Sequence, residues 1–349
     1  MLASYNVAII GCGMAAGGYD ELSGFEHAFT HAGAIKKHKL FNLVAISDND
    51  EKRLNEFKKT WNVNIVYVDY IDLLKNEKLD LLCIAVPDDL HYSVLSDTLR
   101  ISDVKHVLVE KPIALKTGEA YDIIQNCQRK SVSLYVNYNR RWDQVHGYVR
   151  NLIKNEFLGK IQFIHGYYVR GLLHNGTTMF NTLRMLLSDE VKLVQSLQSF
   201  YFENQHDYAM DAILEFENGS QACIIAADKS GYGHSIFEID IMGNNGRIRL
   251  IDNGYQVQLY ERGAYKRYSG VYELKPVRSN EGNPLPLTQM PFSLINTLDE
   301  IAIDIKSKKN SLKHAEDAIT DLFIAEALLE SNRQNCRKVS LHRNEKNYY

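Results

Sequence analysis

The chain has few prolines, no excess of basic residues and no long apolar run, and these shortages exclude several classes of protein. With 6 prolines, 45% hydrophobic and 24% charged residues in 349, its composition is that of a globular protein and not of a disordered one. The 40 basic and 43 acidic residues leave a net charge of −3, so no basic field is available to bind nucleic acid. No stretch approaches the ~20 apolar residues of a membrane span. The N-terminus lacks the basic segment and full apolar core of a signal peptide.

Cysteine is also scarce, and its distribution indicates the compartment. The five cysteines are scattered, odd in number and without a CxxC pair. This pattern favours reduced thiols in the cytoplasm over a disulfide framework. We therefore expect a cytoplasmic protein that has neither nucleic acid nor membrane as a partner.

The first 140 residues alternate between buried strands and helices of 10 to 15 residues. Such alternation is typical of right-handed βαβ units, so the sequence predicts an α/β fold with a doubly wound parallel sheet. Thr117 is expected to cap the helix that follows the strand at residues 107–109. The expected strands are residues 6–10, 43–47, 79–86, 107–109 and 133–136, and the expected helices are 50–61, 71–75, 90–99 and 117–127.

After residue 140 the pattern changes to a helix (145–155), a strand (161–169), a second helix (177–187) and then alternating strands separated by turn signals, up to about Glu273. Two helices near residues 292–308 and 314–331 follow. The length agrees with two domains. We expect a Rossmann domain over residues 1–138 and, over 139–349, an α+β domain with a large open, mainly antiparallel sheet.

A glycine-rich turn follows the first strand directly. In a dinucleotide fold Gly11 would make the tight turn, Gly13 would let the backbone approach a pyrophosphate, and Ala16 would let helix and strand pack closely. Met14 and Ala15 complete this turn. A glycine turn after a buried strand is common, but its place at the first βα junction favours cofactor binding.

Asp48 ends the second strand and would accept hydrogen bonds from the adenosine ribose. It lies well beyond the usual spacing of about 20 residues from the glycines, because a loop insertion from Gly17 to about Gly33 intervenes. With Asp50 beside it and no adjacent arginine, a 2′-phosphate would be repelled. The sequence therefore favours NAD over NADP. Asp48 could also cap the next helix.

Two further segments follow strands at the carboxyl edge of the predicted sheet, where ligands of such sheets bind. One contains Val86, Pro87 and His91, and the other is Glu110-Lys111-Pro112. A lysine at this edge can hold a substrate hydroxyl and stabilise a developing alkoxide. Taken alone, Lys111 would be a surface lysine with Glu110 as its ionic partner.

These motifs together resemble the Gfo/Idh/MocA family of nicotinamide-dependent oxidoreductases over nearly the whole chain. The resemblance rests on the glycine turn, Asp48, the Pro87–His91 segment, Glu110-Lys111-Pro112 and residues 137–141. It implies a Rossmann domain and a C-terminal domain whose open sheet is used for oligomerisation. It also implies a cofactor site that includes Val86, Pro87, His91, Glu110, Lys111, Asn139 and Arg140.

The resemblance also exposes a departure. Members of the family usually carry an Asp-x-Gly-x-His-x-x-Asp pattern whose histidine accepts the proton from the oxidised hydroxyl. Here His174 stands at the first aspartate, Thr178 at the histidine and Asn181 at the last aspartate. Threonine cannot act as a general base near neutral pH. His174, one helical turn earlier, could supply the base instead, or it could simply cap the helix.

Two functions follow. The first is an NAD-dependent dehydrogenase that transfers a hydride between NAD and a hydroxyl of a sugar, nucleotide-sugar or cyclitol, with Lys111 and His174 as catalytic residues. Arg141 and Thr178 would help to bind this carbohydrate or polyol substrate. The second is a noncatalytic dinucleotide-binding sensor or diverged partner subunit.

The remaining expectations concern metals, the insertion and assembly. His27 and His31 are spaced to pair, but further zinc ligands are lacking, so no metal is expected. His31 could instead approach the cofactor. A sheet with one uncovered face needs a partner, so we expect a homodimer or homotetramer.

Overall fold

The structure is a computed structural model that describes residues 4–201, 207–227, 235–267, 270–277 and 290–341. The chain forms two compact units. The first comprises Met1–Trp142 and Met290–Thr320, and the second Asp143–Gln289 and Asp321–Tyr349. The first break lies near the predicted border at 138/139. Met290–Thr320, which contains helix α9, also falls in the first unit, and this differs from the expected division into two continuous segments.

Helix α9 (Ser293–Ser307) belongs with the first unit because its apolar face is part of that unit's core. Leu294, Leu298 and Ile301 are buried in one cluster with Val7 and Ile9 of the first strand. Burial of such side chains is worth roughly 1.5–3 kcal/mol each. A helix near the C-terminus therefore completes a domain that starts at the N-terminus, which a linear reading of the sequence misses.

The first unit is built on a six-stranded, all-parallel sheet in the order β3-β2-β1-β4-β5-β6. The predicted doubly wound α/β fold is confirmed. The short strand β3 was missed because its three residues carry little pattern. The strands are β1 (Tyr5–Ile10), β2 (Phe41–Ser47), β3 (Ile65–Tyr67), β4 (Leu81–Ile84), β5 (His106–Val109) and β6 (Ser133–Val136).

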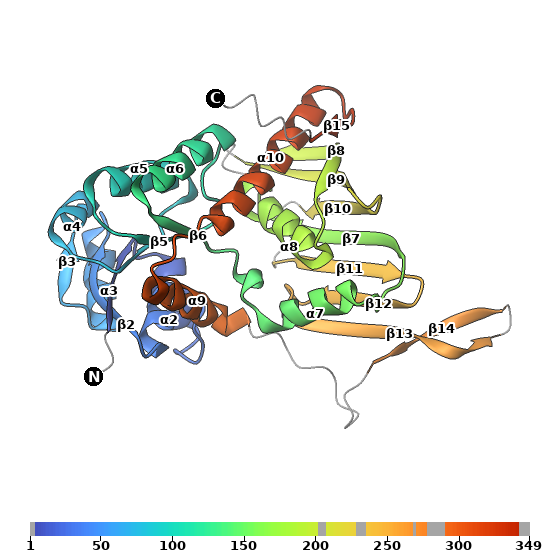
Figure 1. Cartoon of the computed structure of the whole chain (residues 1–349), viewed down its shortest axis with the longest axis horizontal. Helices are drawn as coiled ribbons and strands as arrows, with labels where there is room; N and C mark the ends of the chain where they lie inside the picture. Colours follow the sequence, from blue (N-terminus) through green and yellow to red (C-terminus); the bar gives the residue numbers. More distant parts are fainter. Residues whose placement is uncertain (1–3, 202–206, 228–234, 268–269, 278–289, 342–349) are drawn as a thin grey trace. The chain divides into compact units, whose positions relative to one another are not determined.

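Helices cover both faces of this sheet, with α5 and α6 on one side and α2 and α9 on the other (Figure 1). Helix α6 begins after Lys116, so Thr117 is its first residue and not its cap. Asp50, and not Asp48, caps α3 by accepting a hydrogen bond from the Arg53 N–H. The helices are α2 (His31–Lys37), α3 (Glu51–Trp61), α4 (Tyr70–Asn76), α5 (His91–Ile101) and α6 (Thr117–Lys130), with short turns η2 (Asp88–Leu90), η3 (Asn139–Arg141) and η6 (Met290–Phe292).

The predicted loop insertion is largely ordered helix. It contains the π-helical turn η1 (Met14–Gly18), the short helix α1 (Tyr19–Leu22) and the start of α2. Asp20 is completely buried, and its carboxylate accepts hydrogen bonds from the Phe29 and Thr30 N–H groups. Thr30 in turn caps α2. One buried carboxylate thus determines where α2 begins.

The second unit is built on a nine-stranded sheet in the order β14-β13-β12-β11-β7-β10-β9-β8-β15. Among the strands that the structure describes, only β7 and β10 pair in parallel, so the predicted large, mainly antiparallel sheet is confirmed. The strands are β7 (Ile161–Val169), β8 (Val191–Tyr201), β9 (Tyr208–Phe216), β10 (Gln221–Ala227), β11 (Phe237–Gly243), β12 (Gly246–Ile251), β13 (Gln256–Arg267), β14 (Val271–Pro276) and β15 (Val339–Ser340).

One face of this sheet carries the core of the second unit. Ile164 and Tyr168 of β7 are buried in one cluster with Phe180 and Leu183 of α8 and Leu328 of α10. Residues between them along β7, such as His165 and Tyr167, are exposed on the other face. The helices are α7 (Gln144–Lys154), α8 (Thr177–Leu187), preceded by the π-helical turn η4 (Leu172–Gly176), and α10 (Lys313–Arg333).

Candidate functional site

The glycine turn after β1 has the shape that the sequence predicted. Gly11 has a φ of +92°, and a Cβ there would lie 2.5 Å from the Ala85 carbonyl oxygen, so only glycine fits. A Cβ at Gly13 would meet nothing within 4 Å. Ala16 is completely buried in the core of the first unit. The turn therefore leaves open space beside Gly13 while its base is tightly packed.

Asp48 lies against this turn. Its Oδ2 accepts a hydrogen bond of 2.7 Å from the Cys12 N–H, and its Oδ1 accepts one of 2.9 Å from the Asp50 N–H. A carboxylate has about four acceptor positions, so Asp48 keeps capacity for further donors such as ribose hydroxyls. The structure thus brings the predicted acidic residue and the predicted glycine turn together.

One premise of the cofactor preference needs correction. The sequence suggested that no arginine lies beside Asp48. In the structure, a guanidinium nitrogen of Arg53 lies 3.8 Å from Asp48 and another lies 3.7 Å from Asp50. Arg53 occupies the first turn of α3, which folds its side chain back over the strand end. The two negative charges of Asp48 and Asp50 still exceed the single positive charge of Arg53, whose side chain is half-exposed.

The loops after β4 and β5 are held together by His91. This ring is completely buried, with Nδ1 2.5 Å from the Pro112 carbonyl oxygen and Nε2 3.0 Å from that of Val86. We therefore assign His91 to fixing these loops, a role different from the direct cofactor contact that the sequence suggested. The Lys111–Pro112 peptide bond, directly before the Pro112 carbonyl that His91 contacts, is cis.

Glu110 is the centre of a polar network at the carboxyl ends of β5 and β6. Its Oε1 lies 3.0 Å from His31 Nε2 and accepts a 2.7 Å hydrogen bond from Asn137 Nδ2. Burial favours the neutral form of Glu110, but His31, Asn137 and Lys111 outweigh it and keep its pKa below the ordinary value. Burial also opposes a charge on His31, but its contacts with Cys83 and Glu110 raise its pKa to about 10.

This end of the sheet fits a nicotinamide dinucleotide. The space beside Gly13 would admit a pyrophosphate, and Asp48 would receive the ribose. Asn137 Oδ1 is buried without a hydrogen-bond donor among the described residues, so it offers an acceptor for a carboxamide N–H. The three features thus correspond to three parts of such a cofactor: the space to the pyrophosphate, Asp48 to the ribose hydroxyls and Asn137 to the carboxamide.

In the second unit, His174 lies in the turn η4 and is half-buried. Its Nε2 lies 3.4 Å from Nη1 of Arg170. A guanidinium cannot accept a hydrogen bond, so Nε2 is the unprotonated nitrogen in this contact and could receive a proton. Arg170 has a φ of +69°, a conformation rare for residues other than glycine. Thr178 Oγ1 lies 3.5 Å from the His174 carbonyl oxygen, which it faces as a donor.

The turn that carries His174 is fixed by Asp207. This carboxylate accepts hydrogen bonds from the Leu173 and His174 N–H groups at 2.9 and 3.0 Å. A side chain at Gly171 would collide with it, since a Cβ there would lie 1.7 Å from Asp207 Oδ2. Sequence reasoning missed Asp207 because it lies far along the chain, at the start of β9.

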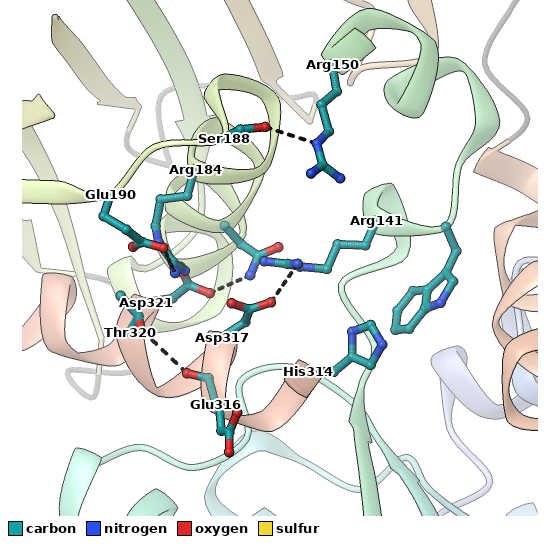
Figure 2. Close-up of polar contacts among 12 residues, drawn as sticks. Arg141, Arg150, Arg184, Ser188, Glu190, His314, Glu316, Asp317, Thr320 and Asp321 are labelled. Atoms are coloured by element: carbon teal, nitrogen blue, oxygen red, sulfur yellow. Dashed lines mark hydrogen bonds and ion pairs between the residues drawn. The ribbon is translucent and has the colours of Figure 1, made fainter. Parts of the chain in front are cut away.

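Asn181 belongs to a buried ionic cluster and not to a catalytic group. Its Nδ2 donates a 2.6 Å hydrogen bond to Oδ2 of Asp321. Arg184 Nη1 donates a 2.8 Å bond to Oδ1 of the same carboxylate, and Figure 2 shows Arg184 beside Asp321. Arg184 also donates to Glu190 from Nε and Nη2. Asn181 can donate a hydrogen bond to Asp321, whereas an aspartate at position 181 would place two carboxylates next to each other.

The three residues after Tyr138 form the turn η3 in the first unit. Arg140 is buried and Asn139 is half-buried. Arg141 donates to Asp317 of α10 at 2.8 Å, as Figure 2 shows. The role of Arg141 in binding a substrate, which the resemblance suggested, stays a prediction.

Lys111 and Arg141 belong to the first unit, whereas His174 and Thr178 belong to the second. Lys111 is half-buried and directly follows Glu110. The cooperation of Lys111 with His174 stays a prediction. Sequence reasoning also missed Asn137 as a partner of Glu110, although it follows β6 just as Glu110 follows β5, and the shared sheet edge would have indicated it.

Neither a metal site nor a membrane span is found in the described part of the chain. Groups of three or more His, Cys, Asp or Glu side chains that could hold a metal ion are absent there. Among the same residues, no helix is both long and apolar enough to cross a bilayer. His27 and His31 do not form a pair: the ring of His27 packs edge-on against Phe29, and His31 binds Glu110.

Comparison with known proteins finds similar oxidoreductases. Residues 5–138 match the model of the oxidoreductase family with an NAD-binding Rossmann fold, Gfo/Idh/MocA. Myo-inositol 2-dehydrogenase of Thermotoga maritima is 24% identical over 241 residues, which are 62% of this chain and 70% of that protein.

Two solved structures share the fold. An oxidoreductase from Agrobacterium radiobacter, in complex with NAD+, L-tartaric acid and magnesium, superposes with a TM-score of 0.72 at 19% identity, covering 97% of this chain and 98% of that one. Aldose-aldose oxidoreductase from Caulobacter crescentus superposes with a TM-score of 0.76 at 17% identity, covering 97% and 100%. The predicted resemblance is confirmed: residues 5–138 of this chain match the NAD-binding Rossmann fold of the Gfo/Idh/MocA oxidoreductase family.

Proposed function

We propose that this protein is an NAD-dependent oxidoreductase that transfers a hydride between NAD and a hydroxyl of a sugar, nucleotide-sugar or cyclitol. The observation that carries the proposal is the open space at Gly13 beside the acceptor Asp48, at the carboxyl edge of a parallel sheet. The names of the relatives, an inositol dehydrogenase and an aldose-aldose oxidoreductase, support the substrate class.

The chain's residues would divide the work as follows. The Gly11–Gly13 turn and Asp48 hold the cofactor's pyrophosphate and ribose, and Asn137 accepts from its carboxamide. The bound cofactor supplies the hydride acceptor. Lys111 donates a hydrogen bond to the reacting hydroxyl and stabilises the developing alkoxide with its positive charge. Nε2 of His174 then takes the proton, which requires Arg170 to release it.

NAD is proposed over NADP because two carboxylates, Asp48 and Asp50, face the place of the adenosine ribose against one guanidinium, Arg53. A 2′-phosphate of charge near −2 would meet a net negative surface there. Arg53 nonetheless lowers this penalty, so the preference is expected to be moderate.

Calorimetry of NADH binding tests the cofactor site. The Gly13→Val variant should bind NADH at least about tenfold more weakly, because its side chain enters the open space while its φ of −81° suits any residue. Gly118→Val on α6, where a Cβ likewise meets nothing within 4 Å, is the matched control. Equal NADH affinity of Gly13→Val and wild type, or no binding by wild type, would refute the site.

A screen of sugars, nucleotide-sugars and polyols, followed by NADH absorbance, tests the reaction. Binding of NADH without turnover of any compound would favour the noncatalytic dinucleotide-binding sensor or partner subunit instead. Thr178, at the position where the family usually has histidine, is the observation that keeps this second function in view.

We also propose that the chain forms a homodimer or homotetramer in the cytoplasm. The uncovered face of the nine-stranded sheet exposes Tyr167, Leu197 and Ile225, each about two-fifths accessible. Apolar side chains gathered on one face are typical of an interface. A monomeric mass by light scattering at micromolar concentration would contradict the assembly.

A further inference from the structure

The buried pair His31–Glu110 joins the inserted segment to the strand end that carries Lys111. His31 is 1% exposed, and its Nε2 lies 3.0 Å from Glu110 Oε1, whose side chain is 17% exposed. Asn137 donates to the same oxygen at 2.7 Å. Two donors from two different elements therefore converge on one carboxylate oxygen.

The insertion is built to place this histidine. His31 is the first residue of α2, directly after the cap Thr30. Asp20 accepts from the Thr30 N–H at 3.1 Å and from its hydroxyl at 2.5 Å, in a fully buried position. A Cβ at Gly33 would lie 1.9 Å from Asp20, so this helix turn is packed tightly against the carboxylate. His31 thus has little freedom to leave Glu110.

Lys111 has anchored neighbours on both sides. Glu110 is held by His31 and Asn137, and the carbonyl of Pro112 is held by Nδ1 of the buried His91. The backbone of Lys111 is therefore fixed between two side-chain contacts. The direction in which its side chain leaves the sheet is set by these neighbours.

Charge balance gives His31 a second effect. An ionised carboxylate in a buried position needs a compensating charge. Glu110 contacts His31 and Asn137, and the positive charge of Lys111 also helps to lower the pKa of Glu110. If His31 were neutral, the ammonium of Lys111 would be the cation left to balance Glu110, and its charge would be drawn away from a substrate.

We propose that His31 is a positioning residue for Lys111: it balances and orients Glu110, so that the ammonium of Lys111 remains directed to the substrate hydroxyl. The proposal rests on the proposed function for the role of Lys111, but the link from His31 through Glu110 to Lys111 is a property of the protein without substrate or cofactor.

The test is the pH dependence of amine labelling of Lys111 in the cofactor-free protein, followed by mass spectrometry of its peptide. Only the neutral amine reacts, so an uncompensated Glu110 should slow the labelling. We expect His31→Gln, which keeps an N–H donor but no charge, to label Lys111 about threefold more slowly near pH 8 and to move the midpoint to higher pH. In the Glu110→Gln background the same substitution should have no effect.

His38→Gln is the matched control, because His38 pairs with the carboxylate of Asp299 at 3.1 Å at the other end of the same helix. It should leave Lys111 labelling unchanged. An unchanged rate in His31→Gln, or an equal slowing in the Glu110→Gln background, would overturn the proposal.

A second measurement uses the wild-type protein and so does not depend on the folding of a variant. Nitrogen chemical shifts of its histidine rings should show His31 as an imidazolium at pH 8. A neutral His31 at pH 8 in the wild type would overturn the proposal. Since both measurements use protein without cofactor or substrate, their failure is distinct from a failure to oxidise any sugar or polyol.

Discussion

The N–H of Cys12 donates a 2.7 Å hydrogen bond to Oδ2 of Asp48, which joins the glycine turn after β1 to the end of β2. Cys12 is buried, so this bond is shielded from water. The contact holds the proposed pyrophosphate and ribose subsites in a fixed relation before any ligand arrives. Such preorganisation lowers the entropic cost of binding.

Asp48→Asn should weaken NADH binding about tenfold and narrow the preference over NADPH. Asparagine keeps the shape but removes the charge, and hydrogen bonds to a charged group contribute about 1.5–3 kcal/mol. Calorimetry with both cofactors measures the change, and Asp72→Asn on the exposed side of α4 is the control. An unchanged NADH affinity would remove Asp48 from the cofactor site.

Asn181→Asp, which restores the family's residue, should destabilise the protein by about 2–4 kcal/mol at neutral pH. The new carboxylate would lie at hydrogen-bond distance from the fully buried Asp321, where it could not remain ionised without cost. The loss should shrink as the pH falls, because protonation of either carboxyl restores a donor. Urea unfolding at pH 7.5 and 5 tests this, and a stability equal to wild type at both values would contradict it.

The contact between Glu300 and His314 should make the free energy of unfolding depend on pH in the acid range. The hydrogen bond from His314, 2.9 Å from Oε1, outweighs burial and lowers the pKa of Glu300 to about 2. A carboxylate with a depressed pKa stabilises the fold above its unfolded value near 4.5 and loses this contribution as the pH falls toward 2. The stability difference between wild type and Glu300→Gln should therefore shrink over this window. Glu56→Gln, exposed on α3, is the control, and a pH-independent difference would contradict the assignment.

Much of the first unit could be predicted because strand and helix periodicity is a local signal. The same logic placed Gly11, Asp48 and Glu110 at one sheet edge, since parallel strands end on the same side. The ordered insertion could not be predicted, because its order comes from one buried carboxylate, Asp20, whose partners are formed by folding.

Contacts across long sequence distances account for two other differences. Asp207 beside His174 and Asp321 beside Asn181 depend on how elements pack, and nothing in the local sequence marks them. The contact of Arg53 with Asp48 is local, but it depends on how the first turn of α3 directs the arginine side chain. The sequence suggested that His31 could approach the cofactor, but its pairing with Glu110 was not predicted. In each case the sequence drew attention to the residue but did not indicate which residue it contacts.

His174→Ala should lower turnover on an established substrate about 10²–10⁴-fold while NAD binding is kept, because general base catalysis contributes that factor. Thr178→His should raise wild-type turnover if the missing base limits it. Steady-state kinetics on both variants measure these effects. Full activity of His174→Ala would end the role of His174 as base.

Single-turnover formation of NADH by wild type and Lys111→Ala, with a polyol or sugar found in the substrate screen, tests the central claim most directly. The account predicts hydride transfer by the wild type and a rate at least about 10²-fold lower in Lys111→Ala, because the charge that stabilises the alkoxide is lost, with NAD affinity nearly unchanged. Equal rates for the two proteins, or no NADH from the wild type and Thr178→His with any sugar or polyol, would contradict it.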